Sequence, residues 1–175
     1  MRFLCYLSLL VCAMLISGAY GAIHDQISFT VSSEYFTKFK YQQFGFVGSP
    51  LPDRAKVAVI GFLASWWMGI PIGGLVGAFG FLHRPASAMF VKTLRALGIV
   101  AIVALLGGLG GLTYGWFFAS HEVADYSGWF LPEDLVSARN FLSVGHMHNC
   151  SYLGGGIGLF VGIAMQCLQR SKHPR

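Results

Sequence analysis

Four of the six histidines in this 175-residue chain lie next to an acidic residue or close to a second histidine. Imidazole and carboxylate groups bind transition metals such as Zn, Cu or Fe when folding brings them together. The sequence therefore predicts a metal-binding site near the ends of the long apolar runs. Its candidate ligands are His24, His121, His146, His148, Asp25, Glu122 and Asp125.

The segment GHMHNCSYLGGG, residues 145–156, contains the closest histidine pair. Residues two apart share a face in an extended chain, whereas on a helix they diverge by about 200°. His146 and His148 can therefore bind one ion together only if this segment is extended. The other interpretation makes all four histidines interfacial residues that hydrogen-bond the loops and lipid headgroups.

The elements that must position these residues are membrane helices. Hydrophobic residues make up 55% of the chain and charged residues only 11%, whereas soluble proteins have about 25% charged residues. Four runs without any ionisable residue are each long enough to cross a bilayer, at about 3–22, 57–82, 96–120 and 150–168. We expect one all-α membrane domain over residues 1–175, in contact with lipid. Without a basic helix or an aromatic RNA-binding motif, nucleic acid is excluded as a partner.

The charged residues between these runs predict the topology. Three segments contain no acid, and their basic residues are Arg2, Arg84, Lys92, Arg95, Arg170, Lys172 and Arg175. All seven acids lie in the other two segments, 23–56 and 121–149. By the positive-inside rule, these two are outer loops, and both termini are cytoplasmic in a bacterial inner membrane. Four basic residues in the first outer loop oppose this orientation: Lys38, Lys40, Arg54 and Lys56.

The first apolar run has two interpretations. Arg2, the hydrophobic stretch and the ending Ala19-Tyr20-Gly21-Ala22 are typical of a secretory signal peptide. Cleavage would leave three spans and the same inner C-terminus. A retained signal anchor is the alternative, because the run is longer than a typical signal core.

Glycine spacing predicts how the helices pack. The last three runs each contain GxxxGxxxG, formed by Gly69, Gly73, Gly77, Gly107, Gly111, Gly115, Gly154, Gly158 and Gly162. Such stripes, often called glycine zippers, allow close backbone contact in lipid, within one chain or between chains. Pro71 should also kink or locally open the second helix.

Two further elements are predicted in the outer loops. The alternation of Ile27, Phe29 and Val31 favours a short strand, followed by aromatic residues at the headgroup level. These aromatic residues are Tyr35, Phe36, Phe39 and Tyr41. Pro132 with two following acids predicts the start of a short amphipathic helix along the outer surface.

The segment HDQISFTVSSEYFTKFKYQQFGF, residues 24–46, resembles uncharacterised bacterial multi-pass membrane proteins that begin with a signal-like helix. It covers about a seventh of the chain. The resemblance implies a bacterial membrane protein and no particular activity.

Three functions follow from these patterns. The leading hypothesis is a non-enzymatic structural, assembly or accessory subunit that packs against itself or within a larger membrane complex. The alternative is a metal-binding or metal-dependent redox protein with an outer-face site of histidines and acids. The third is a small transporter or channel gated near Pro71. The apolar runs contain no ionisable residue, which argues against a proton relay or a haem held between spans. No established catalytic motif is present.

Overall fold

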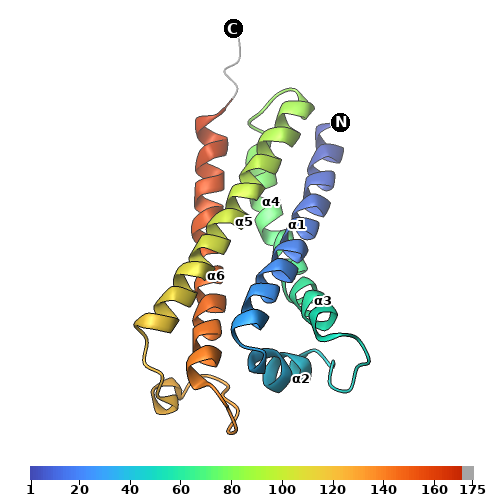
Figure 1. The fold of residues 1–175 in the computed structure, drawn as a ribbon. Coiled ribbons are helices and arrows are strands. Elements are labelled where there is room, and N and C mark those ends of the chain that lie inside the picture. Colours follow the sequence, from blue (N-terminus) through green and yellow to red (C-terminus); the bar gives the residue numbers. More distant parts are fainter. Residues whose placement is uncertain (171–175) are drawn as a thin grey trace.

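The structure is a computed structural model that describes residues 1–170, and these residues form helices and no strand. Four helices are long and apolar enough to cross a membrane: Arg2–Val31, Asp53–Gly80, Ala86–Phe117 and Ala138–Leu168 (Figure 1). The predicted fold class, an all-α integral membrane bundle, is confirmed. Lys172 and Arg175, which contributed to the predicted topology, lie outside the described residues.

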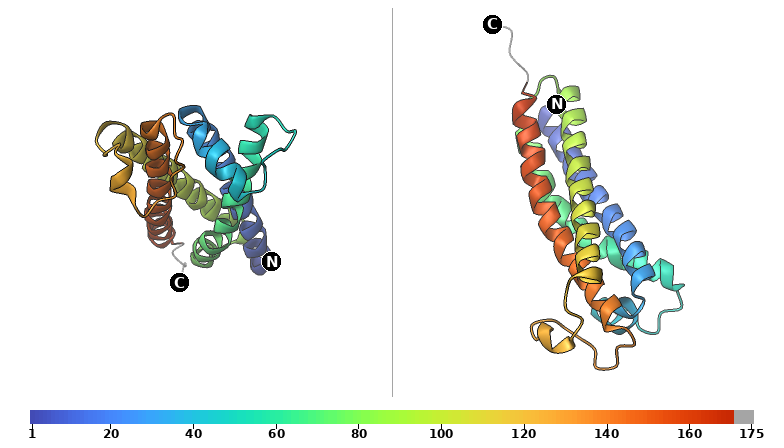
Figure 2. Two further views of the ribbon diagram at one scale, coloured as in Figure 1. Left: turned by 90° about the horizontal axis from the view of Figure 1, so that it is seen from below. Right: turned by 60° about the vertical axis from the view of Figure 1, so that its left-hand side comes forward.

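The bundle consists of two helix pairs. Helices α5 (Ala86–Phe117) and α6 (Ala138–Leu168) share the most extensive contact, and α1 (Arg2–Val31) packs on α3 (Asp53–Ser65) and α4 (Gly69–Gly80). The N-terminus, the turn at 81–85 and the last turn of α6 lie at one end (Figures 1 and 2). The connections 32–52 and 118–137 lie at the other, which we call the loop end.

Two helices extend well beyond their apolar runs. Helix α1 continues to Val31, so the strand predicted from Ile27 and Phe29 is wrong. The contacts of α1 with the rest of the bundle override the local alternation, as tertiary context often does. Helix α6 begins at Ala138, far ahead of its apolar run at 150.

The start of α6 corrects the helix predicted at Pro132. Ser137 is the N-cap, and its hydroxyl accepts a hydrogen bond from the backbone N–H of Asn140 at 3.4 Å. The Glu34 carboxylate accepts from the backbone N–H of Val136 at 2.9 Å and of Ser137 at 3.0 Å. These acceptors satisfy N–H groups that a helix start leaves without partners, so the helix begins at Ala138.

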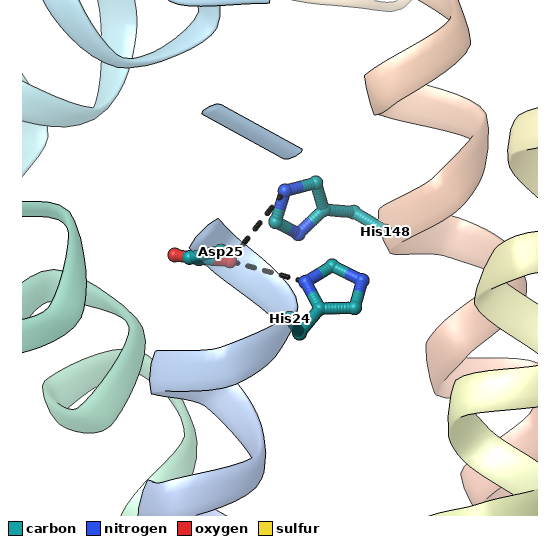
Figure 3. Close-up of side chains that lie close together, drawn as sticks. All are labelled: His24, Asp25 and His148. Atoms are coloured by element: carbon teal, nitrogen blue, oxygen red, sulfur yellow. Dashed lines mark hydrogen bonds and ion pairs between the residues drawn. The ribbon is translucent and has the colours of Figure 1, made fainter. Parts of the chain in front are cut away.

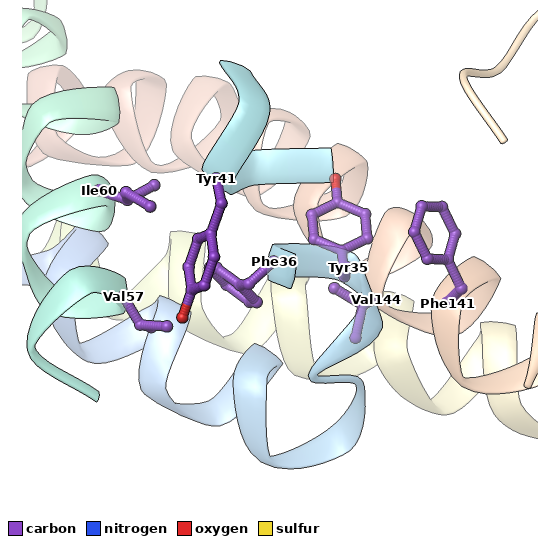
Figure 4. Close-up of a cluster of buried hydrophobic side chains, with 7 residues drawn as sticks. All are labelled: Tyr35, Phe36, Tyr41, Val57, Ile60, Phe141 and Val144. Carbon is purple, nitrogen blue, oxygen red and sulfur yellow. The ribbon is translucent and has the colours of Figure 1, made fainter. Parts of the chain in front are cut away.

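The aromatic segment after α1 is part of the core at the loop end of the bundle. It forms the π-helix η1 (Phe36–Lys40) and the short α2 (Tyr41–Gln43). Its buried rings pack against α3 and α6 (Figure 4). The cluster comprises Tyr35, Phe36, Tyr41, Val57, Ile60, Phe141 and Val144. These contacts close the loop end of the bundle.

All nine glycines of the three stripes face a neighbouring helix of the same chain. Those of α4 face α1, while those of α5 and α6 face each other. A Cβ atom on Gly111 would lie 2.5 Å from the Cβ of Cys150, and one on Gly154 would lie 2.8 Å from the carbonyl oxygen of Val103. Two glycines that the spacing did not select, Gly21 and Gly61, make a similar contact between α1 and α3.

The second membrane helix changes its winding just ahead of Pro71, where a disturbance was predicted. A 3-10 turn, η2 (Trp66–Met68), separates α3 from α4. Pro71 has no N–H to donate to the carbonyl of Trp67, and its ring crowds that carbonyl. The predicted disturbance near Pro71 is therefore seen as a 3-10 turn.

Candidate metal-binding site and cavity

Three of the predicted ligands meet between α1 and α6. His24 and Asp25 are adjacent on α1, and His148 reaches them from α6 (Figure 3). The Nδ1 atom of His24 lies 3.1 Å from Oδ1 of Asp25, and Nε2 of His148 lies 3.9 Å from the same oxygen. One potential ligand atom from each residue lies within 4.8 Å of the others.

Hydrogen bonds and ring contacts hold His24 and His148 in place. Nε2 of His24 lies 3.0 Å from Oγ of Ser151, which also accepts a hydrogen bond from the Tyr20 hydroxyl at 3.1 Å. The His148 ring stacks on Tyr35, with centroids 4.9 Å apart and an interplanar angle of 13°. The Nε2 atom of His148 is buried and has no hydrogen-bond partner among the described residues.

A glycine on α5 makes room for this arrangement. A Cβ atom on Gly108 would collide with Oγ of Ser151 and would lie 3.5 Å from Nε2 of His24. Ser28 adds a contact between α1 and α6, because its hydroxyl lies 3.5 Å from the sulfur of Met147. Helix α5 can therefore approach α6 and the His24 ring of α1 at the level of the site.

His24 and Asp25 are buried within the bundle, and His148 is largely buried. His24 and Asp25 are each 3% exposed, and the His148 side chain is 13% exposed. The apolar runs lack ionisable residues, but the helices extend past those runs and include these three. Buried ionisable residues in membrane helices are costly, and they typically mark functional sites. The lack of ionisable residues in the apolar runs, which argues against a proton relay or a haem between the spans, therefore does not apply to these three residues.

The other predicted ligands lie elsewhere. His146 is on α6 too, but its Nε2 lies 3.1 Å from the Tyr126 hydroxyl, and its ring contacts Trp129. His121 donates from Nε2 to the carbonyl of Gly115 at 2.9 Å, and Asp125 accepts a hydrogen bond from Ser120. Glu122 is exposed. Within residues 1–170, only His24, Asp25 and His148 form a group of three potential metal ligands.

A cavity of about 300 Å³ begins at this site and runs between the two helix pairs. Its polar end includes His24, Asp25, His148 and Ser151, together with Lys40 from η1. Toward the other end its walls are apolar, with Ile16, Leu75, Leu97 and Leu159 among the lining residues. The 3-10 turn in the second membrane helix contributes Met68 to the wall.

Lys40 is the residue of the polar end that the sequence analysis did not select. It is 9% exposed, and its ammonium group lies over the Phe39 ring, 5.1 Å from the centroid. Burial lowers the pKa of this ammonium below its ordinary value. The only sequence signal was a lysine among closely spaced aromatic residues, which is equally typical of a membrane interface.

The chain matches no protein-family model, no curated protein and no solved structure. The functional proposal therefore rests on the chemistry of the buried cluster and its cavity.

Proposed function

We propose that this integral membrane protein binds a transition metal ion, Zn(II) or Fe(II), through His24, Asp25 and His148. The observation that carries the proposal is the buried Nε2 atom of His148, which has no hydrogen-bond partner among the described residues and lies 3.9 Å from the Asp25 carboxylate. A buried polar atom without a partner costs about 1–3 kcal/mol. A metal bond would satisfy it.

The donor set and its spacing support a metal. Two imidazoles and one carboxylate form a common three-ligand set for catalytic zinc and for non-haem iron. Two ligand atoms on a tetrahedral zinc lie about 3.3 Å apart, for bonds of about 2.0–2.1 Å. The separations of 3.1 and 3.9 Å from the Asp25 oxygen are close to that value. With three protein ligands, a bound zinc would keep a coordination position for water or another ligand.

Ser151 would orient the first ligand. Histidines that bind a metal usually donate their second ring N–H to an oxygen, which fixes the tautomer. With Nδ1 of His24 on the metal, its Nε2–H donates to Oγ of Ser151, at the observed 3.0 Å. Tyr20 donates to the same oxygen and holds it in place.

The glycine stripes give less support to a structural or accessory subunit, the leading hypothesis from the sequence. All nine glycines face helices of the same chain, so they offer no face to another subunit. A glycine zipper would then stabilise the single bundle, on which the site between α1 and α6 depends.

The proposed location follows from charge and from the site. The start of α1 and the turn at 81–85 lie at the end of the bundle opposite the loop end, and they contain Arg2 and Arg84. The positive-inside rule would make that end cytoplasmic in a bacterial inner membrane. The resemblance of residues 24–46 to bacterial multi-pass proteins agrees with this location. A retained α1 acts as a signal anchor and keeps His24 and Asp25 in place.

The metal content of detergent-purified protein tests the proposed function. We expect about one zinc or iron per chain in the wild type. His148→Ala should lose most of this metal, whereas His146→Ala, on another side of the same helix, should retain it. A wild type without metal after reloading, or equal metal content in the two variants, would contradict the proposal. Size-exclusion profiles check that both variants remain folded.

A further inference from the structure

The cavity has the layout of an amphiphile site. On α1 its lining residues run from Ala13 to Asp25, which corresponds to about 18 Å of helix. The polar residues lie at the loop end, and the remainder of the cavity lies between apolar side chains. Its volume of about 300 Å³ is at the lower limit of small-molecule sites, so it suits one hydrocarbon chain and not two.

Lys40 gives this site a charge preference. The lysine is buried, and within the part of the chain that the structure describes it forms no ion pair with an acidic side chain. Its one hydrogen bond goes to the Gln43 side chain at 3.2 Å, although an ammonium has three N–H donors. Asp25 lines the same end of the cavity and its charge favours the ammonium form, but the two groups form no ion pair. Buried charges are normally paired, so the remaining donors of Lys40 favour an anion next to the ammonium.

We propose that the cavity binds a single-chain anionic lipid, a long-chain carboxylate, with its head at Lys40 and its tail between the helix pairs. The carboxylate would pair with the ammonium where the aromatic rings of Tyr35, Phe39 and Phe44 limit access of water. The tail would extend past Gly155 toward Leu75 and Leu159. This inference goes beyond the metal site and stands on Lys40 and the cavity.

The head must supply most of the selectivity. A hydrocarbon tail gains little when it moves from bilayer lipid into an equally apolar cavity. An ion pair in a low-dielectric site is much stronger than one in water, and a buried partner left without its counter-charge is costly. The charge of the head should therefore matter more than the length of the tail.

Binding of radiolabelled palmitate to the full-length protein in zwitterionic nanodiscs tests the proposal. Lys40→Met keeps the length of the side chain and removes the charge, so affinity should fall by about tenfold or more. Hexadecanol, which has the same chain length and no charge, should compete at least about tenfold more weakly than unlabelled palmitate. Equal competition by hexadecanol, or unchanged binding to Lys40→Met, would overturn the proposal.

Two leucine substitutions test whether the tail occupies the cavity. Gly155 lines the cavity and Gly110 does not, and a Cβ atom on either meets nothing within 4 Å. Gly155→Leu should therefore fill cavity space and abolish palmitate binding, while Gly110→Leu should bind like the wild type. Full binding by Gly155→Leu would place the ligand outside the cavity and overturn the proposal.

Metal-stripped protein separates this proposal from the metal site. Palmitate binding that persists after chelation and still depends on Lys40 supports the lipid site, even if the protein holds no metal. The opposite result is stoichiometric metal together with palmitate binding that is as weak in the wild type as in Lys40→Met. This result would support the proposed metal site and overturn the lipid proposal.

Discussion

His146 and His148 differ by two positions on α6, and this spacing sends their imidazoles to different sides of the helix. His148 meets His24 and Asp25, whereas His146 contacts Tyr126 and Trp129. The extended conformation in which the two could bind one ion together does not occur here. His148 therefore lies next to His24, a histidine far away in the sequence. His146, which is close in sequence but outside the site, is the matched control position for substitutions of His148.

His83 is a second buried histidine, and it lies in the turn between α4 and α5. It is fully buried, and its Nε2 lies 2.6 Å from the side-chain oxygen of Gln166 on α6. Gln166 in turn donates to the Thr93 hydroxyl at 2.9 Å. Burial, together with the nearby Lys92 ammonium, lowers the pKa of His83, and the hydrogen bond to Gln166 offsets part of this shift.

His83 should make stability fall in mild acid. Its pKa is lower in the folded state than the value of about 6.5 in an unfolded chain, so between these two values the unfolded state binds more protons. Its contribution is fully present above the unfolded value of about 6.5 and is lost as the pH falls from there through the lower pKa of the folded state. We predict that Tm in detergent decreases more for the wild type than for His83→Gln between about pH 7.5 and pH 5.5. Equal decreases in the two proteins would show that His83 is not the titrating group.

Close packing of α5 on α6 depends on individual glycines, and adjacent positions on α5 differ sharply. A Cβ atom on Gly111 would lie 2.5 Å from the carbonyl oxygen of His146, whereas one on Gly110 meets nothing within 4 Å. The first position has no room for a side chain because the two backbones are nearly in contact. The second faces away from α6.

Paired leucine substitutions at these positions test the packing. Gly111→Leu should lower the free energy of unfolding by about 1–3 kcal/mol or more, because the helices must separate to admit the side chain. Gly110→Leu should change it by less than about 0.5 kcal/mol. Reversible unfolding in mixed micelles measures both values. A similar loss for the two variants would mean that the contact does not stabilise the bundle.

Sequence patterns predicted the number and position of the membrane helices, but not the residues at which α1 ends and α6 begins. Apolar runs give the position of a membrane helix directly, because every backbone polar group in lipid must be satisfied internally. The additional turns of α1 and α6 depend on tertiary contacts such as the Glu34 cap, which joins residues a hundred positions apart. The strand predicted at Ile27–Val31 failed because local alternation carries no information about those contacts.

The site itself was predictable only in part. Histidine and acid chemistry identified His24, Asp25 and His148 as ligands, but it could not separate them from His121, His146, Glu122 and Asp125. That separation depends on the rotation of α6 about its axis and on its height against α1, which follow from tertiary packing and not from residue types. Lys40 was missed as a site residue because a π-helix, invisible in the residue pattern, turns it into the cavity.

The molecule as a whole places one polar site and one elongated cavity between two closely packed helix pairs. Helix α1 contributes two of the three ligands and contacts both α3 and α4. A chain that lost residues 1–22 would keep His24 and Asp25 but lose most of the helix that holds them. The proposed site therefore predicts a retained N-terminal helix.

The intact mass of the protein purified from membranes tests whether residues 1–22 are retained. We predict an intact mass that includes residues 1–22. A mature chain that begins at or near Ala22 would show cleavage by signal peptidase, and it would contradict the role of α1 as a permanent part of the bundle.

X-ray absorption at the metal edge of the loaded, full-length protein tests the metal centre most directly, because it reports the ligands themselves. We predict two imidazole nitrogens and at least one oxygen at about 2.0–2.2 Å, as expected for zinc held by His24, His148 and Asp25. His148→Ala should remove one imidazole from the spectrum, and His146→Ala should leave it unchanged. A wild-type spectrum without imidazole scattering, or one that changes only in His146→Ala, would contradict the proposed site.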